Sequence, residues 1–419
     1  MMTARPRTVI IGAGLAGLAC ARRLTEAGIT CIVIERSDGV GGRARTDTLE
    51  GFQLDRGFQV FLTGYPEARR TLDYAALDLK PFYPGAMIRY SGRFHRVSDP
   101  LRRPQDLLST LFNPIGSFTD KYLAFRLRQS ALQHRLGSVA GGSARPTSEC
   151  LRSYGFSEAM LTRFFQPFLS GVFLETALAT PCWVFEYVWA AFSRGVTALP
   201  RQGMGAIAQQ LAATLPPRTI RLNQRVRQID RANVLLDSGE TLSGDVLVIA
   251  TDDETASQLR GKGASGREAR ISTTLYFDAP APPRYGPWLM LNGEGHGLVN
   301  TVCVLSEAVP SYAPNGRALI STTVTDHDAR YDTLPDIVRE FLRSWFGQQV
   351  NEWRHLRTDR IRRALPPVDL LPPSESGMPS RVAEGLYLCG DYRESGTLDG
   401  ALVSGRKAAE TVLADHAMI

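Results

Sequence analysis

The 419-residue chain has no long hydrophobic run, and this absence sets the first limits on its class. No apolar stretch reaches the roughly 18 residues that a membrane-spanning helix needs. Arg5 and Arg7 lead directly into an apolar strand, so the apolar core of a secretion signal is missing. Hydrophobic residues make up 43% and charged residues 21%, a balance that excludes disorder. We therefore expect a cytoplasmic protein, and its length predicts two domains.

Metal-binding spacing is also missing. The six histidines are dispersed, and no cysteine lies in a CxxC pair or near a histidine at ligand spacing. We expect no metal site. We interpret the six cysteines as reduced and mostly buried; they are Cys20, Cys31, Cys150, Cys182, Cys303 and Cys389.

Positive charge, in contrast, is concentrated in one segment. Between Arg89 and Leu136 nine basic residues face three acidic ones, and this excess equals the whole formal charge of +6. Residues 106–136 are predicted to be helical, with apolar residues at helix spacing. Such a helix either lies on an anionic membrane or covers a core with one solvated face. We expect no nucleic-acid partner. The apolar residues of the pattern are Phe118, Tyr122, Phe125, Leu132 and Leu136.

The most informative stretch runs from Thr8 to Thr46. Residues 8–11 form a short apolar strand, residues 15–27 are predicted to be a helix that Gly28 ends, and a second strand ends at Glu35. The turn between the first strand and the helix has the spacing GxGxxG. Such a turn brings backbone N–H groups and a helix N-terminus, with roughly half a positive charge, toward a diphosphate. Glu35 can accept hydrogen bonds from both ribose hydroxyls. The residues that we expect to bind a dinucleotide here are Gly12, Gly14, Leu15, Ala16, Gly17, Glu35 and Arg36.

A second glycine motif, VGGRART, follows the acidic residue. Gly42 permits another close backbone approach, and Arg43 offers a fixed cation to a diphosphate. This run resembles the GGRxxT motif of the flavin amine oxidase and phytoene desaturase superfamily of FAD-dependent oxidoreductases. The resemblance implies bound FAD, whereas a plain NAD dehydrogenase needs no second clamp.

The C-terminal region carries a second resemblance to the same superfamily. GLYLCGDYRESGTLDGALVSG is similar to the GD…xxxEGAxxSG ending, with Asp399 in place of the usual glutamate. The resemblance implies that a final helix directs its N-terminus at the flavin pyrimidine edge, where negative charge develops on reduction. Cys389 is expected to be a buried strand residue, and FAD to be held non-covalently. The expected contacts are Gly390, Asp391, Leu398, Asp399 and Ala401.

Further flavin contacts are implied in the middle of the chain. The run Phe52–Leu62 has strand composition interrupted by Gly57. By resemblance it lies beside the isoalloxazine ring, although it also fits a buried strand with one bulge. Arg56, Gly57, Phe58 and Gln59 are therefore the flavin-facing candidates, and Val226 is placed at the adenine. No catalytic residue is assigned; Arg56 and Gln59 are candidates for orienting groups near the ring.

The predicted fold class is α/β, with a Rossmann-like FAD domain built on a parallel sheet and an α+β substrate domain. We expect the FAD domain to comprise residues 1–80, 195–268 and 358–419. The substrate domain then comprises residues 81–194 and 269–357. Residues 138–148 are predicted to be a flexible loop, and the proline-rich run from Arg363 to Pro373 is predicted to cross back to the FAD domain.

Two aromatic-rich helices are expected in the substrate domain. One follows Ser157, a plausible N-cap, and its FxxPFxxGxF-like run is similar to desaturases and protoporphyrinogen oxidases. The other covers Trp183–Phe192. They form either the domain core or the lining of a hydrophobic substrate chamber.

Two departures weaken the expectation of amine oxidation. Thr397 stands where amine oxidases carry a tyrosine of an aromatic cage, and Ser272 and Thr273 stand where many carry a lysine. The sequence therefore favours dehydrogenation or desaturation of a small apolar, isoprenoid- or carotenoid-like substrate by hydride transfer to flavin N5, with O2 or a quinone as electron acceptor. The alternatives are an amine or protoporphyrinogen-type oxidase and a binding protein without chemistry, since Rab GDP dissociation inhibitors share this fold.

Overall fold

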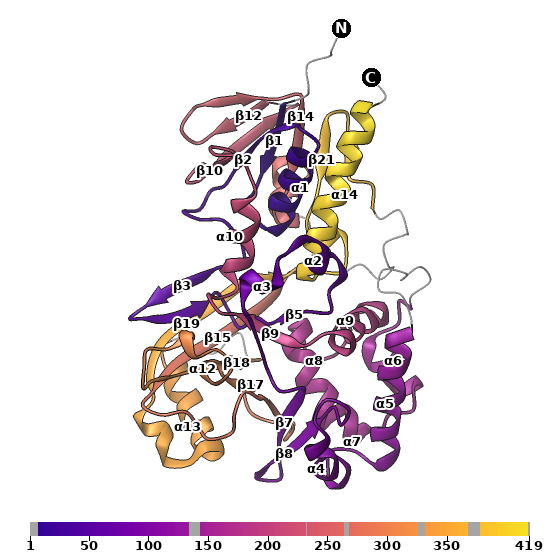
Figure 1. Ribbon diagram of the computed structural model, residues 1–419, viewed down its shortest axis with the longest axis vertical. Coiled ribbons are helices and arrows are strands. Elements are labelled where there is room, and N and C mark those ends of the chain that lie inside the picture. Colours follow the sequence, from indigo (N-terminus) through magenta and orange to yellow (C-terminus); the bar gives the residue numbers. More distant parts are fainter. Residues whose placement is uncertain are drawn as a thin grey trace.

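The computed structural model describes residues 7–133, 143–231, 233–263, 268–325, 332–367 and 378–417. Two lobes are visible in Figure 1, and both ends of the chain emerge from the same lobe. This first lobe is built on a sheet that is parallel except for one edge strand. The second lobe combines a largely antiparallel sheet with a group of helices.

The sheet of the first lobe has six strands. The central strand pairs in parallel with both of its neighbours along its whole length, as Ile11 opposite Ile34 and Ile249 shows. This arrangement confirms the predicted α/β class, since the apolar runs at 8–11, 31–35 and 246–250 all enter one parallel sheet. In sheet order the strands are β10 (Ile220–Arg221), β2 (Thr30–Ile34), β1 (Arg7–Ile11), β14 (Val246–Ile249), β21 (Leu386–Leu388) and β20 (Arg381–Ala383).

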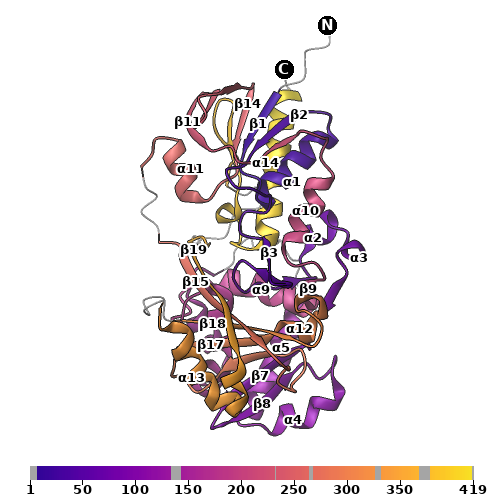
Figure 2. The same ribbon diagram turned by 90° about the vertical axis from the view of Figure 1, so that its left-hand side faces the viewer.

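Helices from distant parts of the sequence pack beside this sheet. Figures 1 and 2 both show the helix that follows β1 lying against the C-terminal helix. The helices of this lobe are α1 (Leu15–Glu26), α10 (Gly205–Ala213), α11 (Asp253–Leu259), α14 (Leu398–Ala417) and the short α2 (Pro66–Thr71) and α3 (Tyr74–Leu77). A three-stranded antiparallel sheet is appended, with β11 (Val226–Asp230), β12 (Asn233–Leu236) and β13 (Thr241–Ser243).

The second lobe contains a seven-stranded sheet with two different faces. One face is covered by the amphipathic helix α13 (Leu334–Phe346), whose Val338 and Leu342 are fully buried. The other face is turned toward the helices of the lobe and toward the cavity described below. In sheet order the strands are β19 (Arg354–Leu365), β15 (Arg270–Ala279), β18 (Ala318–Val324), β17 (Val299–Val304), β16 (Leu289–Asn292), β7 (Gly85–Tyr90) and β8 (Arg93–Ser98).

The helical part of the second lobe differs from the sequence prediction in one respect. The continuous helix expected over residues 106–136 is wrong, because the chain breaks at Pro114 and at Gly116, whose φ is +84°. Ser157 is confirmed as an N-cap, since its hydroxyl accepts a hydrogen bond from the Met160 N–H. No described helix combines the length and apolarity that crossing a bilayer requires. The helices are α4 (Leu107–Phe112), α5 (Phe118–Gln133), α6 (Thr147–Ser153), α7 (Glu158–Met160), the π-helical turn η2 (Leu161–Phe165), α8 (Gln166–Phe173) and α9 (Cys182–Arg194).

Shorter elements connect the two lobes. They are the hairpin β3 (Thr46–Leu49) and β4 (Phe52–Asp55), the small sheet of β5 (Phe61–Leu62), β9 (Thr197–Pro200) and β6 (Leu79–Pro81), α12 (Leu305–Ala308), and the 3-10 turns η1 (Pro104–Asp106), η3 (Pro310–Tyr312), η4 (Gly347–Glu352) and η5 (Asp391–Arg393). Arg5, Arg135, Leu136, residues 138–142 of the loop predicted at 138–148 and the proline-rich residues 368–373 lie outside the described residues. The residue numbers at which we expect the two domains to meet stay predictions.

Candidate active site

One cavity of about 1770 Å³ extends from the parallel sheet of the first lobe into the second lobe. Its wall brings together residues from both ends and from the middle of the chain. The predicted cofactor residues that line it are Gly12, Gly14, Leu15, Ala16, Glu35, Arg36, Gly42, Arg43, Gly57, Phe58, Gln59, Val226, Gly390, Asp391, Leu398 and Ala401. Gly17 and Asp399 do not line it.

The glycine turn between β1 and α1 forms an open cradle. A Cβ added at Gly12, whose φ is +108°, would lie 2.8 Å from the Ala250 carbonyl oxygen, and one at Gly17 would lie 2.0 Å from the Gly12 carbonyl oxygen. These two glycines therefore let the strand, the turn and the helix pack closely. At Gly14 an added Cβ would meet nothing within 4 Å. The backbone at Gly14 is thus open to a ligand, as a diphosphate at a helix N-terminus requires.

Glu35 is held rigidly at the end of β2. Its Oε2 accepts a hydrogen bond of 2.8 Å from the Ala13 N–H, and its Oε1 accepts bonds from the N–H and the hydroxyl of Ser37. The carboxylate is buried, yet it lines the cavity. A fixed acceptor at this place suits ribose hydroxyls and disfavours a phosphate. Ser37, which the sequence reasoning missed, holds this acceptor in place.

An ion pair joins the two ends of the chain at the cavity wall. The Arg43 guanidinium lies 2.7 Å from the Asp391 carboxylate, and it also donates to the Ala364 carbonyl oxygen. Burial acts to lower the pKa of Arg43, but the Asp391 carboxylate outweighs it and raises that pKa above its ordinary value. The arginine therefore stays charged, as a diphosphate clamp requires.

The loop at residues 56–59 is anchored to the second lobe. The Gly57 N–H donates to Asp359, and the Phe58 N–H donates to the Thr274 hydroxyl at 3.1 Å. The Gln59 amide donates to the carbonyl oxygens of Arg43 and Arg56, while the Arg56 guanidinium pairs with Asp47 at 3.0 Å. Both orienting candidates line the cavity, but these polar groups already have protein partners. Their contact with the flavin ring stays a prediction.

Asp399 opens the final helix but turns its carboxylate away from the cavity lining. It accepts a hydrogen bond of 2.7 Å from the Ala68 N–H and one of 2.5 Å from the Tyr187 hydroxyl. Burial raises the pKa of Asp399 to about 6. The residue fixes α14 against α2 and α9, and its neighbours Leu398 and Ala401 line the cavity.

Comparison with known families decides the class of the protein. The chain matches the family described as flavin containing amine oxidoreductase over residues 15–413. The chain belongs to this family. As a flavin-containing amine oxidoreductase the protein is an FAD-dependent oxidoreductase, and the cradle at Gly14, the fixed Glu35 and the charged Arg43 fit that cofactor.

Individual relatives span several chemistries. The chain is 24% identical over 439 residues to a hydroxysqualene dehydroxylase of Rhodopseudomonas palustris, covering 97% of this chain and 98% of the relative. It is 42% identical over 87 residues to a lycopene-forming phytoene desaturase of Pseudescherichia vulneris, covering 18% of this chain and 17% of that protein. A solved structure of putrescine oxidase with bound putrescine aligns with a TM-score of 0.69 at 16% identity, covering 98% of this chain and 99% of that one. The structural likeness shows a shared fold.

The part of the oxidoreductase cavity in the second lobe is largely aromatic. Phe164 stacks on Phe168 with ring centroids 5.7 Å apart, and Phe168 contacts Phe192 at 5.2 Å. These three rings and Trp189 line the cavity, whereas Phe165 and Phe185 are fully buried. The two aromatic-rich helical segments thus supply both the core of the lobe and the wall of a chamber.

Several lining residues were not identified from the sequence. Tyr65 lies at the end of the cavity that also holds Thr397, and Arg363 lines it near Asp252 and Glu254. The face of the sheet opposite α13 contributes Thr301 and Thr323, and also Ser272, which the sequence places at the position of the amine oxidase lysine. The sequence signals for these residues are weak, because hydroxyl side chains on strands are common and their position depends on pairing between distant strands.

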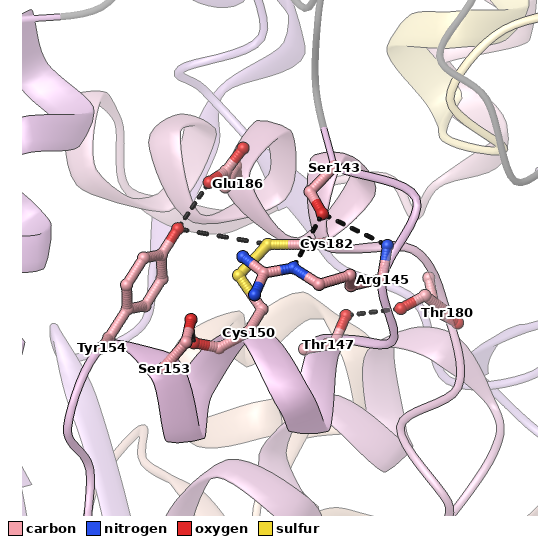
Figure 3. Close-up of a disulfide and its surroundings, with 9 residues drawn as sticks. All are labelled: Ser143, Arg145, Thr147, Cys150, Ser153, Tyr154, Thr180, Cys182 and Glu186. Carbon is pink, nitrogen blue, oxygen red and sulfur yellow. Dashed lines mark hydrogen bonds between the residues drawn. A yellow bond between two sulfur atoms is a disulfide. The ribbon is translucent and has the colours of Figure 1, made fainter.

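The expectation of six reduced cysteines is wrong for two of them. Cys150 on α6 and Cys182 at the start of α9 form a disulfide, and Figure 3 shows it between Tyr154 and Arg145. The two residues are 32 positions apart, and only the packing of α6 against α9 brings them together. Glu186 lies near the two sulfur atoms, but both sulfurs are used in the disulfide. The other four cysteines are free and buried, as predicted, including Cys389 directly after β21.

Proposed function

We propose that this FAD-dependent oxidoreductase dehydrogenates or desaturates an apolar, isoprenoid- or carotenoid-like substrate. The observation that carries this proposal is the single cavity that joins the cofactor cradle to a chamber walled by Phe164, Phe168, Trp189 and Phe192. A long apolar molecule buries its surface well against such a wall, at about 25 cal/mol per Å².

The residues that line the cavity support separate roles for the cofactor, the aromatic wall and the loop at 56–59. Bound FAD would supply the hydride acceptor, flavin N5. The aromatic wall orients an apolar chain and excludes water, while the anchored loop at 56–59 gives that chain a rigid surface to rest on. Desaturation removes a hydride from one carbon and a proton from its neighbour. We propose that the hydride would pass from an activated allylic carbon to the flavin and the proton to solvent, and that no strong protein base is required because loss of the hydride makes that proton acidic. O2 and a quinone both stay candidates for the electron acceptor.

The full-length relative supports an isoprenoid-related substrate. It is named for hydroxysqualene, and its similarity covers nearly the whole of both chains. The shorter match, named for phytoene, points to the same class of compound.

Oxidation of an amine or a porphyrinogen is the second candidate function. Tyr65 lines the same cavity as Thr397, and its ring stacks on Tyr187 with centroids 6.3 Å apart. An aromatic face beside Thr397 could contact an alkylammonium group in place of the missing cage tyrosine.

Anaerobic reduction of the bound flavin separates the two candidates. The purified protein would be mixed with detergent-dispersed carotenoid precursors, with polyamines and with protoporphyrinogen, and the flavin absorbance followed. We expect bleaching by the polyenes alone. The variant Phe168→Ala removes a ring from the cavity wall and should raise KM for the polyene. The matched control Phe341→Ala, on α13 and away from the cavity, should leave KM unchanged. Bleaching by amines alone would replace the first proposal by the second.

We further propose that the cavity opens onto a membrane surface. Large hydrophobic side chains are exposed on α4 and α5, with Phe112 73% and Leu108 67% exposed. We call this surface the apolar mouth; it comprises Leu107, Leu108, Phe112, Phe118, Tyr122 and Phe125. Four of its residues, Leu107, Phe118, Tyr122 and Phe125, also line the cavity. Figure 1 places α4 and α5 in the lobe away from the chain ends.

The charges around the apolar mouth suit an anionic bilayer. Arg126 and Arg96 are exposed, and the carboxylates of Asp106 and Asp120 are buried, although Arg96 lies 3.5 Å from the Asp106 carboxylate. The local surface is therefore positive, and each cation near an anionic membrane contributes on the order of 1 kcal/mol. Of the two alternatives for this basic segment, the outward-facing apolar residues favour the membrane. An apolar substrate could then pass from lipid into the cavity without crossing water. The cytoplasmic location stays a prediction.

A further inference from the structure

A row of threonines crosses the sheet face that borders the cavity. Thr323 on β18 lies opposite Thr274 on β15 and opposite Thr301 on β17. Residues paired in this way point to the same face and have Cβ atoms about 5 Å apart. The row therefore runs from the loop at Phe58, which donates to Thr274, outward across three neighbouring strands.

Among the residues that the structure describes, no partner is found for the central hydroxyl of this row, whereas the two outer hydroxyls have one. The Thr274 hydroxyl accepts a hydrogen bond from Phe58, and the Thr301 hydroxyl accepts one from the Asn300 amide at 3.0 Å. The Thr323 hydroxyl has no partner among the residues that the structure describes, although the residue is only 7% exposed. The Ser170 hydroxyl also has no hydrogen-bond partner among the described residues, and Ser170 is only 5% exposed. Buried polar groups are normally hydrogen-bonded, so these two hydroxyls are suited to a ligand.

Thr323 and Ser170 both line a side pocket of about 300 Å³. This pocket shares Leu174, Arg270 and Thr323 with the main cavity, so it is an extension of the substrate chamber. Its two charged groups compensate each other, because Arg270 lies 3.7 Å from the buried Glu175 carboxylate. The pocket therefore offers hydroxyls at a place without net charge, which favours an uncharged oxygen group.

We propose that the substrate carries a hydroxyl group, which Thr323 and Ser170 bind in the side pocket while the apolar chain lies against the aromatic wall. This inference rests on the proposed apolar substrate. It narrows the substrate class from isoprenoid compounds in general to isoprenoid alcohols. Thr323 both accepts and donates hydrogen bonds, so it can satisfy an alcohol but gains nothing from a hydrocarbon.

The experiment compares two probes with similar chains, farnesol and the hydrocarbon farnesene, on the FAD-loaded protein. Binding is measured by the change in flavin absorbance and by the ligand-induced rise in Tm. The variant Thr323→Val keeps the shape of the side chain but removes the hydroxyl. Its matched control is Thr322→Val, the adjacent residue of β18, which is also buried and also lacks a partner among the described residues but belongs to the face covered by α13.

We expect farnesol to bind the wild type more tightly than farnesene does. Thr323→Val should weaken farnesol binding about tenfold, as the loss of one buried hydrogen bond predicts, and leave farnesene binding unchanged. Thr322→Val should change neither. Equal binding of the two probes to the wild type, or equal effects of the two variants, would overturn this inference and leave the proposed function intact. If neither probe binds, the proposed apolar substrate fails, and this inference fails with it.

Discussion

At the scale of single residues, two buried carboxylates stabilise the region around the cofactor cradle. Asp55 accepts hydrogen bonds from Thr46, Tyr312 and the Met204 N–H, and Asp399 accepts them from Tyr187 and Ala68. Burial raises the pKa of each to about 6. Each carboxyl group is therefore easier to protonate in the folded protein than in the unfolded chain.

This shift predicts a pH-dependent stability for Asp399. Its pKa is about 3.9 in an unfolded chain and about 6 in the folded protein, so between these values the folded state binds more protons. We therefore expect the contribution of Asp399 to the free energy of unfolding to fall as pH rises from about 4 to about 6, by at most about 3 kcal/mol, and to stay level above that. We expect Asp399→Asn to remove this part of the slope. Urea unfolding of both proteins with excess FAD, at half-unit pH steps, measures the difference.

The control for this prediction is Asp336→Asn, which changes an exposed carboxylate on α13. The difference in free energy of unfolding between the wild type and Asp336→Asn should not fall with pH in the way expected for Asp399→Asn. A wild-type minus Asp399→Asn difference that stayed constant from pH 4 to pH 7 would show that Asp399 is not shifted.

The residues of the cradle were predictable because each glycine motif is local. Gly12, Gly14 and Glu35 lie within one strand, turn, helix and strand unit, and their expected roles follow from the glycine spacing together with that local context. The direction of the Asp399 carboxylate was not predictable. Its partners Tyr187 and Ala68 are 212 and 331 positions away in the sequence.

At the scale of elements, periodicity predicted which segments are helices but not which faces are covered. The apolar pattern of α5 is present, yet Phe118, Tyr122 and Phe125 are exposed instead of buried. The threonine row was not predictable either, because its members are brought together only by the pairing of β15, β18 and β17. Register between distant strands is set by tertiary structure and leaves no local sequence signal.

The disulfide between α6 and α9 leads to a prediction at this scale. It closes a loop of 32 positions, which stabilises the folded state by about 3–4 kcal/mol. Because four cysteines are free, denatured protein should titrate four thiols before reduction and all six of the chain's cysteines afterwards. Reductant, or Cys150→Ala with Cys182→Ala, should lower stability by the stated amount. Cys303→Ala is the control and should retain sensitivity to reductant. If six thiols titrate without reduction, the disulfide is absent and the original expectation of six reduced cysteines holds.

At the scale of the whole molecule, the two lobes meet at one cavity. The ends of the chain supply Gly14, Arg43 and Asp391, and the middle supplies the aromatic wall and the threonine row. The cavity reaches the apolar mouth in the lobe away from the chain ends. If that surface rests on a membrane, the cofactor cradle stays in water while the substrate end faces lipid.

The last prediction tests this orientation by vesicle sedimentation. We expect the wild type to sediment with vesicles that contain phosphatidylglycerol and less with pure phosphatidylcholine. Leu108→Ser with Phe112→Ser, two residues of the apolar mouth outside the cavity lining, should weaken binding more than tenfold, since burying each side chain contributes roughly 1.5–3 kcal/mol. Arg126→Gln should weaken it roughly fivefold and reduce its salt sensitivity, because one cation near the surface contributes about 1 kcal/mol and salt screens that contribution.

The matched controls are Ile337→Ser, an exposed apolar residue on α13, and Arg218→Gln, an exposed cation of the first lobe. Neither should change sedimentation, because neither belongs to the apolar mouth. Activity on detergent-dispersed substrate should survive in Leu108→Ser with Phe112→Ser, which separates loss of membrane contact from loss of chemistry. Two results would refute the membrane contact: a wild type that stays in solution with anionic vesicles, or a lipid-free dimer that the double variant converts to a monomer. The second result would assign the apolar mouth to a second copy of the chain, since a surface buried between two copies is closed to lipid.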